Sequence, residues 1–342
     1  MFLLHLFHYI GFFGAQINNS ILSFLILKRA PKLLGAYRHV MLTFTICSMW
    51  FSWVEIVTQP VVHHKGPMFV VFLEERGFSE RVGHFIACLH CGTFGFITSV
   101  LTAQFFYRYL VLCKPQTLRF LTGFRLFSIF LPSLFIYIFW FSVVDWGMSA
   151  TPEKREYLRG ELKLIFNIDS MSVAFIASWY WEISDSQRIW RFKDVLSAGI
   201  CVLIIGTLCS LILFFAINIF FHMKNASSQM SQKTVDLNKQ LFVMLCVQTL
   251  FPFFTMYIPV GLLIGLPLLN LSMNPYTNYA SASIAIYPMI EPLIAMYCIS
   301  DFRKTIANFM RGWKRGPRVA TVRTYIITGN QLATSTGSAV PN

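Results

Sequence analysis

The sequence predicts an all-α membrane protein, a seven-transmembrane helix bundle with its N-terminus outside and an amphipathic interfacial helix after the seventh span. Composition indicates the class, because 56% of the 342 residues are hydrophobic and only 13% are charged, as is typical of integral membrane proteins. Apolar runs of roughly 20 residues recur along the chain, and a helix of that length crosses about 30 Å of hydrocarbon. Lysine and arginine gather in alternate loops, which indicates the orientation of the bundle.

Seven apolar runs give the predicted spans. An odd number puts the two termini on opposite sides of the bilayer, and the basic loops after the first, third and fifth spans mark the cytoplasmic side. The formal net charge of +13 is therefore assigned to a membrane surface, and no nucleic-acid partner is predicted. The expected spans are Leu3–Leu27, His39–Val62, His84–Cys113, Leu126–Val144, Val195–Phe221, Leu241–Leu263 and Tyr276–Ile299.

The first two spans carry polar residues inside apolar runs. The first span has no basic segment before it and is too long for a cleaved signal, so we expect it to stay in the protein. Its amides Gln16, Asn18 and Asn19 are expected to pack against neighbouring helices. The second span carries Glu55. Because an isolated carboxylate in lipid is costly, Glu55 should face the bundle interior.

The third span has polar residues graded from end to end. His84, Cys88 and Cys91 share a helical face at i, i+4 and i+7, a spacing able to hold a soft metal. We interpret this face as packing beside a cavity, and we predict no metal and no cofactor. Arg108, near the inner end, either snorkels to the interface or forms a switch at the cytoplasmic mouth of the bundle. The predicted outer loops contain no cysteine, so no loop disulfide is expected.

Two segments outside the spans carry further expectations. Asp145–Asp194 is much longer than a usual connection and is rich in tryptophan, which indicates a folded lid over the outer face; a solvated loop is the alternative. We expect a transmembrane domain over residues 1–315 and a disordered tail over 316–342. After the last span, apolar residues on one helical face predict the interfacial helix. They are Phe302, Ile306, Phe309, Met310 and Trp313.

Motifs of enzymes are absent from the sequence, which has no glycine-rich phosphate loop, zinc-protease helix or nucleophile elbow. No catalytic residue and no enzyme activity is therefore predicted. Segments in the predicted helices and loops, in the right order, carry a family resemblance instead. They are Gly35–Arg38, Gln59–Pro60 with His63, Phe106–Tyr109, Lys239–Phe242, Gln248–Pro252, Tyr257–Pro259, Tyr287–Leu293 and Phe302–Lys304. On these segments the chain resembles the nematode serpentine chemoreceptors of the Str type, a group of seven-helix G-protein-coupled receptors of sensory neurons.

The resemblance implies that a small, often volatile odorant binds in the outer half of the bundle and that a heterotrimeric G protein binds at the inner face. It also implies a place in the plasma membrane, in the ciliary membrane of sensory neurons. Arg108 matches the arginine of the Asp-Arg-Tyr motif of related receptors, but Tyr107 stands where the acid would be, so no adjacent ionic lock is expected. A transporter or ion channel, and a seven-helix adaptor that traffics other receptors, are the alternatives.

Depth along the helices, counted at about 1.5 Å per residue, divides the candidate residues into two sets. Gln104, Gln248 and Glu291 fall at one depth, so we expect them to meet in a hydrated network above Arg108; the alternative is that they only hold the helices together. The outer set is predicted to line the ligand cavity: Glu55, Gln59, His84, Cys88, Thr255, Tyr257 and Tyr279. The inner set is predicted to serve activation and G-protein coupling: Gln104, Tyr107, Arg108, Tyr109, Gln248, Tyr287 and Glu291.

Overall fold

The fold was analysed in a computed structural model of the chain, which has two compact units, residues 1–300 and 301–342. The predicted domain boundary after residue 315 falls outside the described residues. The structure describes residues 2–29, 34–73, 78–226, 231–274, 276–314, 325–328 and 331–334.

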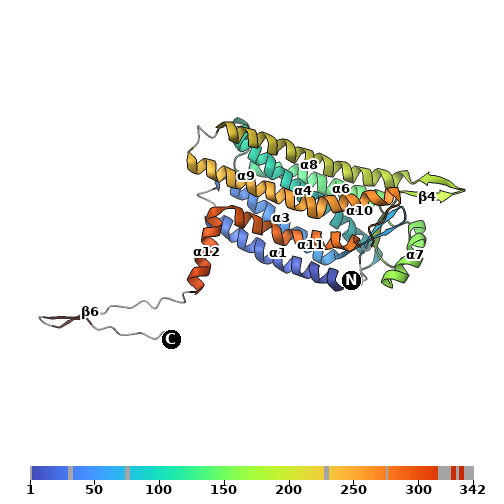
Figure 1. The fold of residues 1–342 in the computed structure, drawn as a ribbon, viewed down its shortest axis with the longest axis horizontal. Coiled ribbons are helices and arrows are strands. Elements are labelled where there is room, and N and C mark those ends of the chain that lie inside the picture. The colour runs from blue at the N-terminus through green and yellow to red at the C-terminus, as the bar shows by residue number, and fades with distance from the viewer. Residues whose placement is uncertain are drawn as a thin grey trace. The chain divides into compact units, whose positions relative to one another are not determined.

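The described residues of the first unit form seven helical segments long and apolar enough to cross a membrane, which confirms the predicted architecture (Figure 1). Two of the segments are interrupted by 3-10 or π turns. The segments are α1 (Phe2–Arg29); α3 (Tyr37–Thr58); α4 (Glu80–Cys113); η1 (Gly123–Phe130) with α6 (Leu131–Gly147); α8 (Phe192–Ala226); α9 (Gln232–Pro252) with η3 (Phe253–Tyr257), α10 (Ile258–Gly265) and η4 (Leu266–Leu269); and α11 (Thr277–Cys298). A short helix, α5 (Pro115–Leu118), follows α4.

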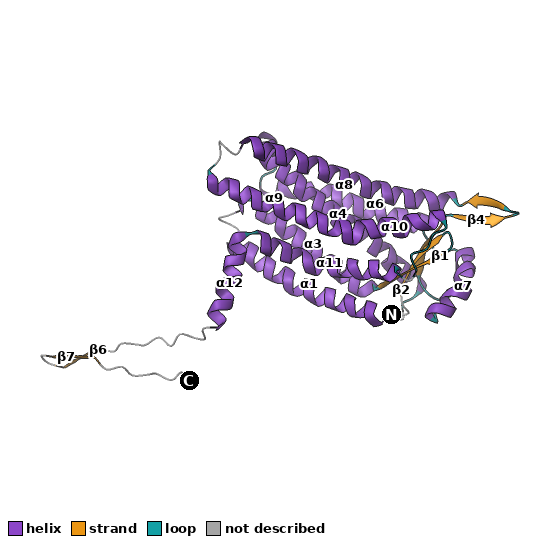
Figure 2. Cartoon of the chain, viewed as in Figure 1, coloured by secondary structure: helices purple, strands orange, loops and turns teal. Residues whose placement is uncertain are grey.

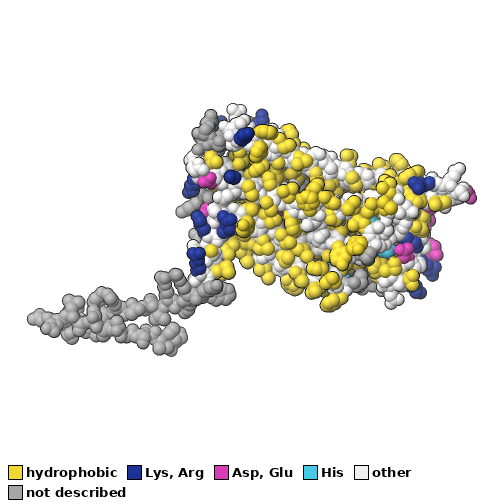
Figure 3. Space-filling view, viewed as in Figure 1, with side chains coloured by type: hydrophobic (Ala, Val, Ile, Leu, Met, Phe, Trp, Pro, Cys, Tyr) yellow, Lys and Arg dark blue, Asp and Glu magenta, His cyan; other side chains and the backbone are white. Residues whose placement is uncertain are grey.

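The surface of the first unit has the charge pattern expected of a membrane protein. Figure 3 shows hydrophobic side chains over most of the visible face, with lysine and arginine gathered at one end and both charge signs at the other. The N-terminus lies at the end of mixed charge, which we call the outer end (Figure 1). The positive-inside rule assigns the basic end to the cytoplasm.

Helix α4 is the central helix of the bundle. In its most apolar stretch 67% of the residues are buried, against 22% for α8, and α4 packs against α3, α6 and α8. At Gly95 an added Cβ would lie 2.5 Å from the Trp140 ring of α6, so only glycine permits this close approach. A residue on α4 can therefore contact most of the bundle, whereas most of α8 faces lipid.

Helices α1 and α11 are joined by side-chain amides. Pro292 has no N–H, so the carbonyl of Pro288, four residues earlier, loses its helical partner. The Asn19 side chain of α1 donates to that carbonyl at 3.0 Å, and Asn18 donates to the neighbouring Met289 carbonyl at 2.9 Å. Gln16 in turn donates to Ser52 of α3 at 2.7 Å. The predicted cross-helix packing of all three amides is confirmed.

The second span ends earlier than predicted. Helix α3 stops at Thr58 rather than continuing to Val62, because Gln59 adopts a left-handed φ of 38° and Pro60 disfavours a helical residue before it. Strand β1 (Pro60–Lys65) then begins and pairs with β2 (Met68–Leu73). The connection between the second and third spans is thus a β-hairpin, which the purely helical prediction missed.

The long outer segment is a folded lid, as predicted, and not a solvated loop (Figure 2). It contains α7 (Pro152–Phe166) and β3 (Phe175–Trp179), which adds to β2 as the third antiparallel strand. A second hairpin, β4 (Trp181–Ser184) with β5 (Gln187–Trp190), precedes α8. We call β1, β2, β3 and α7 the outer cap.

The sheet of the outer cap is buried on both faces. Val61, Val70 and Phe175 share a core cluster with Leu158 and Leu162 of α7. The alternate residues of the strands point toward the bundle. This two-sided burial explains the continuous apolar run of β2, whose six residues are all buried.

A buried ion pair ties the cap to the bundle. Lys154 of α7 is 1% exposed, and its Nζ lies 2.6 Å from Asp194 in the first turn of α8. The ammonium also donates to the Ala177 carbonyl of β3 at 2.7 Å, and Asp194 accepts the Trp179 N–H at 2.9 Å. Burial lowers the pKa of Lys154, and the Asp194 carboxylate opposes that shift.

Two further contacts hold the cap to α4 and to the α10–α11 connection. Arg155 pairs with Glu80 at the start of α4 at 2.5 Å. In β1, His64 Nδ1 accepts the N–H of Met273 at 3.3 Å, and the Asn274 side chain donates to the His64 carbonyl at 2.7 Å. Burial lowers the pKa of His64 to about 4, which keeps the ring neutral and able to accept.

Helix α12 (Ser300–Lys314) starts one residue before the second unit, and the rest of the helix belongs to that unit. The expected helix after the last span is therefore present, and Phe309 and Met310 are exposed on it. Within the tail expected to be disordered, β6 (Tyr325–Thr328) pairs with β7 (Gln331–Thr334). The rest of the tail lies outside the described residues.

Removal of one partner of the Lys154–Asp194 pair should destabilise the protein. We expect Lys154→Met to cost about 3–5 kcal/mol of unfolding free energy, because it leaves a buried carboxylate without its cation. The double variant Lys154→Met with Asp194→Asn should recover part of that loss, since the asparagine oxygen still accepts from Trp179. Thermal unfolding of the detergent-purified chain measures both. Equal stability of Lys154→Met and wild type would contradict this role.

Stability should fall as the pH drops from about 6.5 to 4. The pKa of His64 is lowered in the folded state, so between these values the unfolded chain binds a proton that the folded chain does not, and acid favours unfolding. The measurement is the difference between melting temperatures at pH 7 and pH 5. This difference should shrink in His64→Gln; an unchanged difference would assign the acid sensitivity to other groups.

Candidate functional site

A partly open cavity lies beneath the outer cap, at the outer end of the bundle. Its roof is the inward face of the sheet, and its walls come from α4, α6, α8, α10 and α11. The space open to the centre of a water molecule is about 90 Å³. The lining residues are Pro60, Val62, Phe69, Val71, His90, Cys91, Phe94, Trp140, Val144, Met148, Ile176, Cys201, Val260, Leu263, Ile264, Ser281 and Ile284.

The cavity lining is apolar except for a few groups on α4 and α11. His90 lines the cavity, and its Nδ1 lies 3.1 Å from Glu55 Oε1 of α3. His8 of α1 approaches the other Glu55 oxygen at 3.7 Å, so the carboxyl group, 2% exposed, sits between two imidazoles. The expectation that Glu55 faces the bundle interior is confirmed. Ser281 donates to the Pro60 carbonyl at 2.7 Å, which closes the rim between α11 and the sheet.

The predicted outer set lies around this cavity rather than in its lining. Glu55 is behind His90, and Gln59 Oε1 is 2.7 Å from His5 Nδ1. Thr255 bonds the Phe251 carbonyl of its own helix at 2.8 Å. Tyr279 is 63% exposed and lies on the outside of the bundle.

Tyr257 touches the cavity through another ring. Its ring stands edge-on to Phe94, with centroids 6.1 Å apart at 85°, and Phe94 lines the cavity. Tyr257 is the last residue of η3, a π-helical turn that follows Pro252. Such turns interrupt the regular backbone ladder and are frequent at functional sites. The helix that approaches the cavity is therefore discontinuous at this point.

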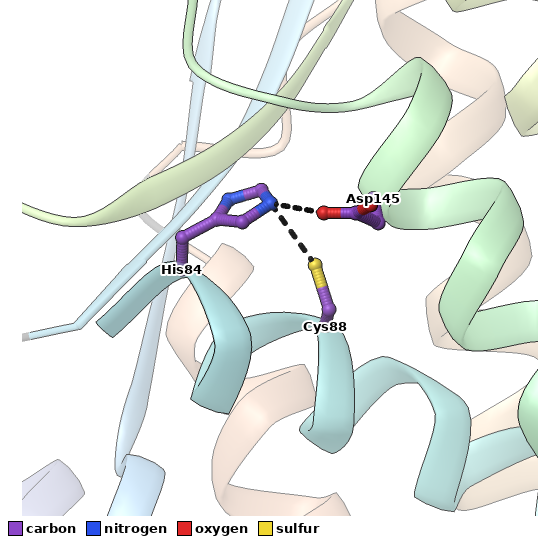
Figure 4. Close-up of side chains that lie close together, drawn as sticks. All are labelled: His84, Cys88 and Asp145. Atoms are coloured by element: carbon purple, nitrogen blue, oxygen red, sulfur yellow. Dashed lines mark hydrogen bonds and ion pairs between the residues drawn. The ribbon is translucent and has the colours of Figure 1, made fainter. Parts of the chain in front are cut away.

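His84 and Cys88 lie at the outer edge of α4, apart from the cavity. Figure 4 shows Cys88 and Asp145 of α6 both contacting one ring nitrogen of His84. His84 Nε2 is 2.8 Å from Asp145 Oδ1 and 3.5 Å from Cys88 Sγ. Cys91, expected on the same face as these two, instead lines the cavity.

His90 is the cavity residue that the sequence reasoning overlooked. An ionisable side chain within an apolar span is a functional signal in itself, and His90 lies in the outer part of the third predicted span. Sheet residues of the roof could not be found in this way, because the second span was predicted to continue to Val62 and no strand was predicted after it.

The inner polar residues form two groups. Gln248 of α9 donates to the Glu291 carboxyl of α11, and both are almost fully buried. Gln104 of α4 instead accepts the Tyr37 hydroxyl of α3 at 3.3 Å. These direct hydrogen bonds join two different pairs of helices, and the hydrated network expected to join all three residues stays a prediction.

Arg108 is held inside the bundle. Its side chain is 4% exposed, which excludes snorkelling, and Nη2 donates to Asn238 of α9 at 2.9 Å. The guanidinium lies 5.3 Å from the Tyr37 ring centroid, and Tyr37 stacks on Tyr107 at 5.6 Å. Arg108 thus links α4 to the inner end of α9, below the π turn.

The remaining members of the inner set pack on aromatic neighbours. Tyr109 is half-buried against Phe215 of α8, with ring centroids 5.4 Å apart. Tyr287 of α11 is buried and stacks on Phe251 of α9 at 6.4 Å. Tyr287 therefore lies at the α9–α11 contact that Gln248 and Glu291 also form.

Comparison with known proteins gives consistent matches over most of the chain. The family model described as "Serpentine type 7TM GPCR chemoreceptor Str" matches residues 4–307. The chain is 28% identical over 299 residues to "Serpentine receptor class r-10" of Caenorhabditis elegans, covering 84% of this chain and 86% of the relative. It is 26% identical over 298 residues to "G-protein coupled receptor str-217" of the same organism, covering 85% of each. With the seven spans and this family match in hand, the chain belongs to the serpentine Str family of seven-transmembrane G-protein-coupled chemoreceptors.

Proposed function

We propose that this receptor binds a small, mostly apolar odorant in the cavity beneath the outer cap and activates a heterotrimeric G protein at its inner end. The plasma membrane, and within it the ciliary membrane of a sensory neuron, is the proposed location. The observation that carries the proposal is the apolar cavity with His90 in its wall and Glu55 behind it.

Cavity size limits the ligand. The free space of about 90 Å³ is roughly six to nine times the space that one water molecule takes on the same measure. A molecule of about six to nine non-hydrogen atoms therefore fits without rearrangement. The lining favours a hydrocarbon body with one hydrogen-bonding group directed at His90, because an apolar pocket with few polar groups selects for that chemistry.

A chain of contacts leads from the cavity to the inner end. Phe94 lines the cavity and touches Tyr257 in the π turn. Below that turn, α9 carries Gln248, bonded to Glu291, and Asn238, bonded to Arg108. A ligand that displaces Phe94 would bias the bend at η3 and so the position of the inner half of α9.

The Arg108–Asn238 hydrogen bond defines the resting arrangement in this proposal. It holds the inner ends of α4 and α9 together, on the cytoplasmic side of the Tyr37–Gln104 hydrogen bond. A G protein that binds the opened inner end, and a ligand that favours the same form, would shift one population together.

The proposal is tested by expressing the chain in cells with and without a coupled G protein and applying an odorant panel. Second-messenger production that needs both the odorant and the G protein supports it. Ion current or substrate uptake without the G protein would favour a channel or transporter. Altered surface delivery of co-expressed receptors, without any evoked signal, would favour a trafficking adaptor.

A larger side chain in the cavity wall should weaken the response. Cys91→Phe places a ring in the cavity and is expected to raise the half-maximal odorant concentration at least about tenfold, equivalent to about 1.4 kcal/mol of binding free energy. Cys91→Ala is the matched control, because it leaves the cavity open at the same position. Equal dose–response curves for the two variants, at equal surface expression, would place the ligand elsewhere.

Loss of the inner hydrogen bond should raise basal signalling. A hydrogen bond to a charged group contributes about 1.5–3 kcal/mol, so Asn238→Ala should increase ligand-free activity about tenfold or more. Arg108→Ala should abolish evoked signalling, since the proposed G-protein contact is lost. Asn218→Ala is the control, because that amide bonds only its own helix in the contacts described. Basal activity in Asn238→Ala equal to that of Asn218→Ala would contradict the closed-state role.

A further inference from the structure

We propose that His84, Cys88 and Asp145 form a zinc site at the outer ends of α4 and α6. The three residues offer a nitrogen, a sulfur and a carboxylate oxygen, all within 4.8 Å of one another, in the part of the chain that the structure describes. This site is separate from the odorant cavity and from the proposed function. Figure 4 shows the three side chains turned toward a common point.

The backbone of the site comes from two rigid helices. His84 and Cys88 are one turn apart on α4, and Asp145 lies near the end of α6. The two helices pack closely along their length, as the contact of Gly95 with Trp140 shows. Ligands on packed helices hold a metal geometry better than ligands on loops.

The separations are close to those of a tetrahedral zinc ion. With Zn–N and Zn–O near 2.1 Å and Zn–S near 2.3 Å, neighbouring ligand atoms lie about 3.3–3.6 Å apart. Here Cys88 Sγ is 3.5 Å and Asp145 Oδ1 is 2.8 Å from His84 Nε2. The carboxylate has to move outward by about half an ångström, and the Asp145 side chain is 55% exposed.

Hydrogen bonding can use only one of the two contacts on His84 Nε2 fully at a time. Both contacts end on the same nitrogen, which either carries a proton or offers a lone pair. A protonated Nε2 donates to Asp145 and leaves the thiol with a weak contact; an unprotonated Nε2 accepts from the thiol but turns a lone pair toward the carboxylate. A cation between the three groups accepts a lone pair from each of them.

Charge and access also fit a divalent ion. Zinc binding releases the thiol proton of Cys88 to solvent, and the resulting thiolate with the Asp145 carboxylate neutralises the two positive charges. The nearby cation Arg155 is already paired with Glu80. Arg81 lines the adjacent surface hollow together with His84, and its positive charge limits the affinity. With three protein ligands, the fourth zinc position is open to water.

Cys91 provides the internal control. Its spacing from His84 and Cys88 would allow a different site on one helix face, but the structure turns it into the odorant cavity. Cys88 and Cys91 lie three residues apart on the same helix, and replacing either one removes one thiol from the chain. Only Cys88 should affect metal binding.

The test uses the full chain, purified in detergent, stripped with a chelator and titrated with Zn²⁺ and, as a spectroscopic probe, with Co²⁺. We expect one equivalent of either metal and a thiolate-to-cobalt charge-transfer band. Cys88→Ser should remove the band and lower zinc affinity at least about tenfold, and Asp145→Asn should lower the affinity with the band retained. Cys91→Ser should match wild type.

Two outcomes overturn the proposal. One is wild-type protein that takes up no stoichiometric zinc. The other is a charge-transfer band that survives in Cys88→Ser or is lost in Cys91→Ser. The Asp145 side chain is mostly exposed, so Asp145→Asn tests the site even if Cys88→Ser fails to fold. Thermal unfolding of each metal-free variant verifies the fold. Lower zinc affinity in Asp145→Asn at an unchanged apo melting temperature supports the site.

Discussion

The buried ion pair between Lys154 and Asp194 is the interaction on which the outer half of this receptor depends. It joins α7, β3 and the first turn of α8 at one point. A sheet lying over an apolar cavity has to be fixed to the helices around it, and all eight cysteines of the chain are free. The cap is therefore held by charge and by hydrogen bonds to carbonyl groups. Such bonds are stronger when both partners are buried, and a buried charge that loses its partner is costly, so the stability of the cap depends on both partners together.

Helix α4 carries residues at both the cavity and the inner end of the bundle. His90 in the cavity wall and Arg108 at the inner end are 18 residues apart on it, about 27 Å along the axis. A helix packed on three sides is a poor moving part. The interrupted helix beside it, α9 with η3 and α10, has the irregular backbone and the proline that permit bending. In the proposed mechanism, α4 therefore stays in place while the inner half of α9 moves.

Apolar periodicity was enough to predict the seven spans, because each must satisfy its own backbone in lipid. The same constraint predicted the interior position of Glu55 and the cross-helix amides. The sheet escaped prediction for a physical reason: β1 and β2 are buried on both faces, and a continuous apolar run such as that of Met68–Leu73 lacks the alternation that distinguishes a strand from a helix. Depth counting put Gln248 and Glu291 at one level, where they bond. It carries no information on rotation about the helix axis, which is why Tyr279 faces outward and Gln104 bonds Tyr37.

The amides of α1 bear on how the chain is assembled during its synthesis. Helix α1 emerges first and α11 last, and the carbonyl of Pro288 receives its donor only when the two meet. Until then one N–H of the Asn19 amide is already bonded to Ala15 of its own helix at 2.9 Å, so α1 in the bilayer has only the second N–H of that amide left to satisfy. The first and last helices of the bundle thus close it by contacting each other. A chain that ends before α11 would keep α1 in the bilayer but could not form this contact.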